Sequence, residues 1–144
     1  QQTCLSNHHI RNQIEGYAPF KGLFPYEEQF VQFRVLRSIN GETHVPLHSD
    51  FIGNPPRRAL SEHVFDPNRI QATLLLSEKE VDYTGEGFVF VTEDNTPIDP
   101  CVHAKAGDLL LWRYNEDHMV RSIHSSKTQL GFLRIIFPVV DKWQ

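Results

Sequence analysis

Short apolar segments separated by turn residues most constrain the fold of this 144-residue chain. The segments lie at 31–39, 44–51, 69–77, 87–92, 108–114, 118–123 and 132–140. The first alternates with period two, with Val31, Phe33 and Val35 on its largely apolar side. Asn54-Pro55-Pro56 and residues 94–100 predict loops. Many short strands at close spacing, with no helical period after residue 30, indicate an all-β sandwich or barrel.

The N-terminal stretch, up to about residue 28, has no clear period. Ser6 predicts a cap for a short helix over residues 8–15, which Gly16 would end. We interpret this stretch as a short flanking segment. The length of 144 residues suits one domain. A single domain at 1–144, with a core at about 30–140, is therefore expected.

The composition, with 40% hydrophobic and 22% charged residues, is that of an ordinary soluble globular protein. The net charge of −4 argues against a nucleic-acid partner. No apolar run approaches the roughly 18 residues that cross a membrane. Cys4 and Cys101 are too few for a disulfide framework, so a reducing, cytoplasmic location is expected. With Met119 as its only methionine, the chain is expected to be processed or part of a longer one.

The composition is unusual in its eight histidines. The most informative of them is His48, which lies in the sequence His48-Ser49-Asp50. On a strand, His48 and Asp50 point to the same face. They would then supply two of the three ligands of a facial triad, in which two histidines and one carboxylate leave the opposite side of an iron open. A hydrogen-bonded His–Asp pair without a metal is the alternative interpretation.

The third ligand would come from a distant strand, and two histidines are candidates. His118 begins an apolar segment and shares one face with Val120 and Ser122. His124 follows that segment and precedes a loop-like Ser-Ser-Lys sequence. We favour His118, because a strand holds a ligand more rigidly than a loop does.

Arg134 is a lone cation in the apolar segment Gly-Phe-Leu-Arg-Ile-Ile-Phe. A buried arginine needs an anionic partner, which either the protein or a ligand supplies. Its planar guanidinium can hold a carboxylate through two parallel hydrogen bonds. An outward-facing arginine on a half-buried strand is the alternative.

The order of His48-x-Asp50, the Gly107–Trp112 strand, His118 and Arg134 resembles the Fe(II)/2-oxoglutarate-dependent dioxygenases. The Asp-Tyr-Thr-Gly-Glu-Gly-Phe turn at 82–88 is similar to a turn before a core strand in many members. The resemblance covers about residues 30–140. It implies a double-stranded β-helix, of the jelly-roll or cupin-like kind, as the core.

The resemblance also implies an activity and the residues that serve it. His48, Asp50 and His118 would bind Fe(II), and Arg134 would pair with the distal carboxylate of 2-oxoglutarate. Reaction with O₂ would release succinate and CO₂ and hydroxylate an unactivated C–H bond. Hydroxylation is the default outcome for a chain that keeps the carboxylate ligand, and desaturation and ring closure stay open. A small-molecule substrate is expected, and the oligomeric state is left open.

Two features depart from the family pattern. His118 and Arg134 are 16 positions apart, whereas His124 would give the separation of 10 that many members show. Many members also carry a serine or threonine two residues after the arginine, where this chain has Ile136. Another hydroxyl is then needed, and Thr73 is the candidate.

Three other classes remain open on the sequence. A cupin-type metalloenzyme usually has a His-x-His pair, which this chain lacks. A non-catalytic jelly-roll module that binds a ligand would not need the His-x-Asp…His order. A zinc hydrolase is compatible with two histidines and an aspartate, but it would leave Arg134 without a task.

Overall fold

The computed structural model describes residues 2–19, 21, 29–31, 33–41, 45–50, 70–114, 116–137 and 139–141. The predicted loop at 54–56 lies outside these residues. Antiparallel β-sheets dominate the described chain, which confirms the all-β prediction. None of the described helices is both long and apolar enough to cross a membrane.

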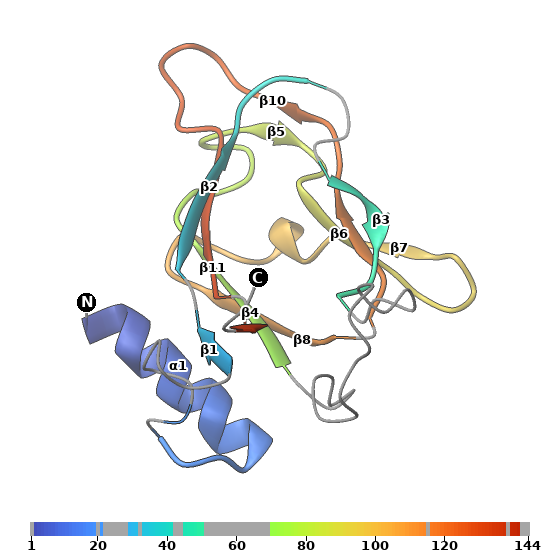
Figure 1. Ribbon diagram of the computed structural model, residues 1–144. Helices are drawn as coiled ribbons and strands as arrows, with labels where there is room; N and C mark the ends of the chain where they lie inside the picture. The colour runs from blue at the N-terminus through green and yellow to red at the C-terminus, as the bar shows by residue number, and fades with distance from the viewer. Residues whose placement is uncertain are drawn as a thin grey trace.

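Two four-stranded sheets face each other across the interior (Figure 1). The first has the order β2-β11-β4-β8, formed by Arg34–Ser38, Phe132–Ile136, Ile70–Leu75 and Leu109–Arg113. The second has the order β3-β9-β6-β7, formed by Val45–His48, His118–Val120, Phe88–Val91 and Pro97–Ile98. All neighbouring strands in both sheets are antiparallel.

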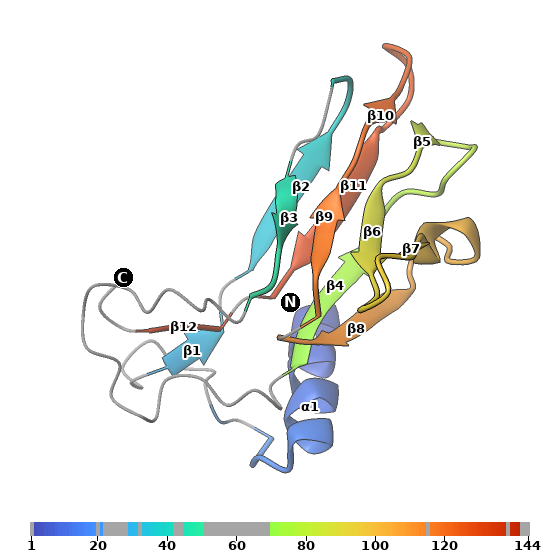
Figure 2. The same ribbon diagram turned by 90° about the vertical axis from the view of Figure 1, so that its right-hand side faces the viewer.

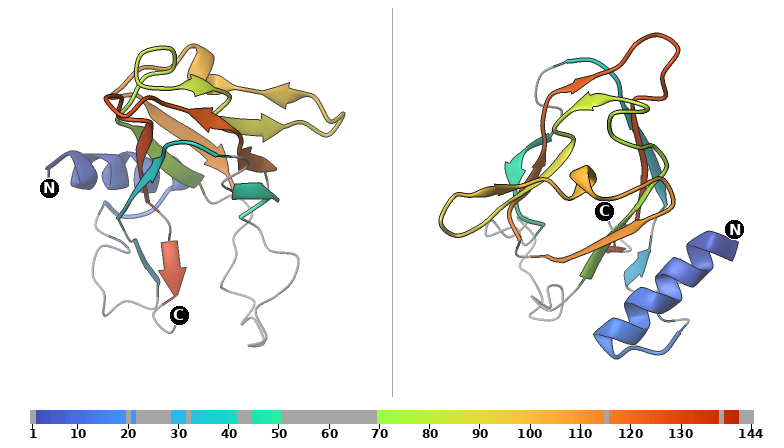
Figure 3. Two further views of the ribbon diagram at one scale, coloured as in Figure 1. Left: turned by 90° about the horizontal axis from the view of Figure 1, so that it is seen from above. Right: turned by 180° about the vertical axis from the view of Figure 1, so that it is seen from behind.

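Smaller elements complete the described fold. Two further antiparallel pairs join β1 to β12 and β5 to β10, formed by Gln29–Val31, Val139–Asp141, Thr84–Gly85 and Ile123–His124. A 3-10 helix, η1, covers Pro100–Val102 after the β6–β7 hairpin. This hairpin extends away from the body of the molecule (Figure 3). Residues 94–100, predicted as a loop, therefore contain strand β7.

Helix α1 (Gln2–Glu15) packs against β4 on the outside of the first sheet (Figure 2). Gly16 follows it with φ of 76°, the left-handed conformation in which glycine commonly ends a helix. The predicted end is therefore correct, but the helix begins before the predicted Ser6 cap. Arg11 anchors the helix, since its guanidinium is buried and donates a 2.7 Å hydrogen bond to the carbonyl of Phe137.

The main core lies between the two sheets. Its fully buried members include Leu75 and Phe132 from the first sheet and Phe88 and Val120 from the second. A smaller cluster of Ala72, Leu74 and Phe137 lies on the other face of the first sheet. Strand β4 therefore has buried apolar side chains on both of its faces.

Strand β2 turns its more polar side inward. Leu36 lies opposite Arg134, and Arg34 lies opposite Ile136, so both share the inner face of β11. Phe33 and Val35 are 46% and 66% exposed. The apolar side found in the sequence is therefore the outer side of this strand.

Candidate metal centre and its cavity

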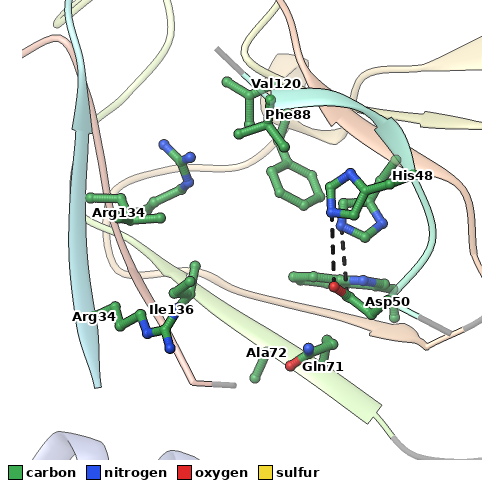
Figure 4. A pocket seen from close by; sticks show the side chains of 13 residues that line it. Arg34, His48, Asp50, Gln71, Ala72, Phe88, Val120, Arg134 and Ile136 are labelled. Carbon is green, nitrogen blue, oxygen red and sulfur yellow. Dashed lines mark ion pairs between the residues drawn. The ribbon is translucent and has the colours of Figure 1, made fainter. Parts of the chain in front are cut away.

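His48, Asp50 and His118 come together at one end of the second sheet. Their ligand atoms all lie within 4.8 Å of one another. Nε2 of His48 is 3.9 Å from one carboxylate oxygen of Asp50, and Nε2 of His118 is 3.6 Å from the other (Figure 4). Two imidazoles and one carboxylate at this spacing are the donor set of a facial metal triad.

A bulge in β3 aims His48 at the interior. Val45 pairs with Val120 and His48 pairs with His118, so β3 has one residue more than β9 between the two pairs. In a regular strand, Val45 and His48 would point to opposite faces, because they are three positions apart. Both instead line the same cavity. The bulge is therefore the local feature that brings the first ligand to the second.

Backbone carbonyls orient both imidazoles. Nδ1 of His48 lies 2.8 Å from the carbonyl oxygen of Pro46, and Nδ1 of His118 lies 2.9 Å from that of Glu116. A carbonyl only accepts hydrogen bonds, so each Nδ1 carries the proton and donates it. Each Nε2 then keeps its lone pair, directed toward Asp50. Fixing the tautomer in this way is typical of metal-binding histidines.

The electrostatics of the cluster also suit a cation. Burial lowers the pKa of His118, which favours the neutral imidazole that a metal requires. Oδ2 of Asp50 is buried and accepts no hydrogen bond from the described part of the chain. A buried carboxylate oxygen without a donor is costly unless a cation compensates it. The residues present therefore fit a divalent metal ion.

Aromatic rings enclose the inner side of His118. The ring of Phe88 stacks on it, with centroids 5.3 Å apart and an interplanar angle of 18°. Trp112 approaches from the opposite sheet, with its ring centroid also at 5.3 Å. The His118 side chain is consequently only 5% exposed, whereas that of His48 is 39% exposed. One ligand is fixed in the core, and the other faces the opening.

Arg134 lines the same cavity from the first sheet. It is 3% exposed, its guanidinium lies 4.5 Å from the ring centroid of Phe132, and its Nη1 is 3.4 Å from the hydroxyl of Ser38. Burial lowers its pKa to about 10, so it remains charged at neutral pH. No carboxylate of the described residues forms an ion pair with it. An anion is the kind of partner that such a buried cation requires.

The triad and Arg134 line one cavity of about 200 Å³ between the sheets (Figure 4). His124 lies outside it, because β10 pairs with β5 and the residue is exposed. Thr73 lies fully buried on the inner face, but it does not line the cavity. The hydroxyl beside Arg134 belongs to Ser38 instead.

Sequence reasoning missed three further polar residues that contribute to this region: Arg34, Ser38 and Gln71. Arg34 and Gln71 line the cavity, and Ser38 contacts Arg134. The sequence does contain a signal for Arg34 and Ser38, since residues 34, 36 and 38 share one face of a strand. In the register that the structure shows, that face is the one that carries Arg134 on β11.

Comparisons with known proteins give no match: no family model and no curated protein matches the sequence, and no solved structure matches the fold. The assignment of this chain therefore depends on its own residues and their geometry.

Proposed function

We propose that this chain is an Fe(II)- and 2-oxoglutarate-dependent oxygenase that hydroxylates a small molecule. One observation carries the proposal: a His-Asp-His cluster and a buried arginine without a carboxylate partner among the described residues line one cavity. A zinc hydrolase would need the three ligands but not the buried cation. The arginine thus favours a cosubstrate with a second, distal carboxylate.

Strand order supports a double-stranded β-helix for the core. Taking β2, β3, β4, β6, β7, β8, β9 and β11 as eight successive strands, the first pairs with the eighth and the second with the seventh. The third pairs with the sixth and the fourth with the fifth. This is the pattern of one long hairpin rolled up, with β11–β4 and β9–β6 contacts closing the roll. We extend the proposal to one domain over residues 1–144.

Each residue has a distinct task in this proposal. His48, Asp50 and His118 would hold Fe(II) through two Nε2 atoms and a carboxylate oxygen. The Arg134 guanidinium, assisted by the Ser38 hydroxyl, would fix the distal carboxylate of 2-oxoglutarate through paired hydrogen bonds. Phe88 and Trp112 would exclude water from the inner side of the centre. When bound, iron and 2-oxoglutarate supply O₂ activation coupled to release of succinate and CO₂.

Anaerobic titration of the iron-loaded protein with 2-oxoglutarate tests the proposal. We expect a visible metal-to-ligand charge-transfer band that saturates at one equivalent. If an iron-loaded, folded sample gives no band, 2-oxoglutarate does not bind at the metal. That result would contradict the proposal and favour the cupin and zinc alternatives. Absence of iron uptake would favour a binding module. We also propose a reducing, cytoplasmic setting, since Cys101 is a free and buried thiol.

A further inference from the structure

The cavity contains a second group of polar side chains whose hydrogen-bonding groups have no task in the proposed oxygenase chemistry. Arg34 from β2 and Gln71 from β4 line it, with Trp112 from β8. Gln71 and Trp112 are directly opposed in the β4–β8 ladder, so their side chains lie on the same inner face. In Figure 4, Arg34 lies beside Ile136, and Gln71 lies at the same side of the cavity.

This group consists mainly of hydrogen-bond donors. The guanidinium of Arg34 and the indole N–H of Trp112 only donate, while the amide of Gln71 can donate and accept. Nε1 of Trp112 is buried and has no partner among the described residues. Gln71 is only 8% exposed. Arg34 is exposed, whereas Gln71 and Nε1 of Trp112 are buried. Donors that face a cavity, two of them buried, match a ligand whose atoms only accept, such as an oxyanion.

Arg34 and Arg134 occupy different positions along the cavity. Arg34 is level with Ile136, whereas Arg134 is one inner-face position further along β11, beside Phe132 and Ser38. Trp112 touches His118, so the Gln71–Trp112 pair lies level with the triad. The two arginines therefore occupy different positions along the cavity, and the Gln71–Trp112 pair marks its triad end.

We infer that Arg34, Gln71 and Trp112 bind an oxyanion of the substrate, which makes that substrate a small carboxylate or phosphorylated compound. The inference rests on the proposed function for calling this ligand the substrate. Arg34 has another interaction within the protein. A guanidinium has five N–H donors, so a second partner can still be held.

The charge inside the cavity agrees with this inference. Its described lining contains Arg34 and Arg134 as cations and Asp50 as its only acid. A divalent metal would add two positive charges, and 2-oxoglutarate would add two negative ones. The loaded site would then keep one positive charge, which a monoanionic group would neutralise.

Trp112 fluorescence provides a test that needs neither metal nor turnover. The chain has two tryptophans, so Trp143→Phe leaves Trp112 as the only reporter. In this background, phenylacetate, phenylphosphonate and the neutral phenylacetamide are titrated into the metal-free protein. We expect saturable quenching by at least one anion, with affinity about tenfold above that of the amide, the size typical of charge-assisted hydrogen bonds. The preferred anion separates a carboxylate from a phosphoryl substrate.

Variants decide whether Arg34 carries the preference. Arg34→Gln is expected to remove the tenfold advantage of the anion, and Gln71→Leu to reduce it. Arg113→Gln is the matched control: this arginine adjoins Trp112 in sequence but lies on the outer face of β8, so the preference should persist. Equal binding of anion and amide by the parent protein, or an unchanged preference in Arg34→Gln, would overturn the inference.

A second readout separates this inference from the proposed function. Arg34→Gln is expected to retain the saturable 2-oxoglutarate band, which Arg134→Gln should lose. Loss of that band in Arg34→Gln but not in Arg134→Gln would make Arg34 the cosubstrate anchor and overturn the inference. Absence of a band in every protein, together with an intact anion preference, would contradict the oxygenase proposal and leave the oxyanion site supported.

Discussion

His48 and His118 are directly opposed in the β3–β9 ladder, with ring centroids 4.4 Å apart, although a bulge interrupts that ladder between them and the Val45–Val120 pair. The pairing means that two candidate ligands 70 positions apart in sequence are positioned by one backbone register. Asp50 lies two residues after His48, just beyond the end of β3.

Asp50→Ala is expected to weaken Fe(II) binding by more than about a hundredfold, the upper loss typical of changes to groups that only support a ligand. The reason is that Asp50 supplies the single negative charge of the cluster. Equilibrium titration with Fe(II) under anaerobic conditions measures the effect. Glu93→Ala, at an exposed acid outside the cluster, is the control. Undiminished affinity in Asp50→Ala would contradict the triad.

Arg134→Met is expected to stabilise the protein while abolishing 2-oxoglutarate binding. The change replaces a buried cation, without a carboxylate partner in the described chain, by an apolar side chain. Such replacements can raise the free energy of unfolding by about 1 kcal/mol or more. Urea denaturation and the charge-transfer titration measure the two effects. Arg134→Lys, which keeps the charge without the paired donors, should lower the affinity for 2-oxoglutarate and leave metal binding unchanged. A less stable Arg134→Met protein would show that the arginine is structural.

Gly131→Ala is expected to destabilise the fold more than Gly107→Ala. Both glycines have positive φ, 75° and 102°, so both substitutions carry backbone strain of about 1 kcal/mol. A Cβ at Gly131 would lie 2.4 Å from the carbonyl oxygen of Ser38, whereas nothing lies within 4 Å at Gly107. The difference between their urea midpoints isolates the clash. Equal losses would mean that β2 shifts without cost.

Stability is expected to fall at alkaline pH, because burial raises the pKa of Tyr83 above its ordinary value of 10.0. Above that pH the unfolded chain loses the phenolic proton while the folded chain keeps it. The free energy of unfolding then falls by up to about 1.4 kcal/mol per pH unit. Burial also raises the pKa of Cys101, which acts in the same direction.

Tyr83→Phe removes the phenolic proton and should flatten the alkaline decline. The substitution also removes the hydroxyl whose hydrogen bond lowers the pKa of Cys101. Arg134, whose pKa burial lowers to about 10, contributes with the opposite sign in both proteins. Denaturant titrations across the alkaline range measure the two slopes. Parallel declines in the two proteins would show that Tyr83 does not titrate differently on folding.

Period-two patterning was sufficient to predict the β-class and the location of most strands, because hydrophobic alternation and turn residues are local signals. His48 and Asp50 converge as predicted. The strand predicted over 44–51 ends at His48, however, so the chain after β3 and not strand alternation positions Asp50. The inner side of β2 could not be predicted in this way. Phe33 and Val35 are more apolar than Arg34 and Ser38, yet they face outward.

The reason for this inversion is that the interior side of β2 serves a cavity and not a packed core. Polar residues are retained where they face a ligand, so the local pattern gives the wrong side. Helix α1 shows the same limit, since its buried residues include Asn7, His8 and Arg11, while Ile10 and Ile14 are exposed. Neither arrangement follows from hydrophobic periodicity alone.

The candidate metal ligands lie on the second sheet and directly after its strand β3, and Arg34 and Arg134 lie on the first sheet. Packed sheets are separated by about 10 Å. This separation sets the length of any molecule that must reach from the triad to Arg134. Leu75 and Phe132 help to set that gap, although they belong to the core. Discrimination between dicarboxylates of different chain length would therefore respond to substitutions of these hydrophobic residues, although they supply no hydrogen bond to the ligand.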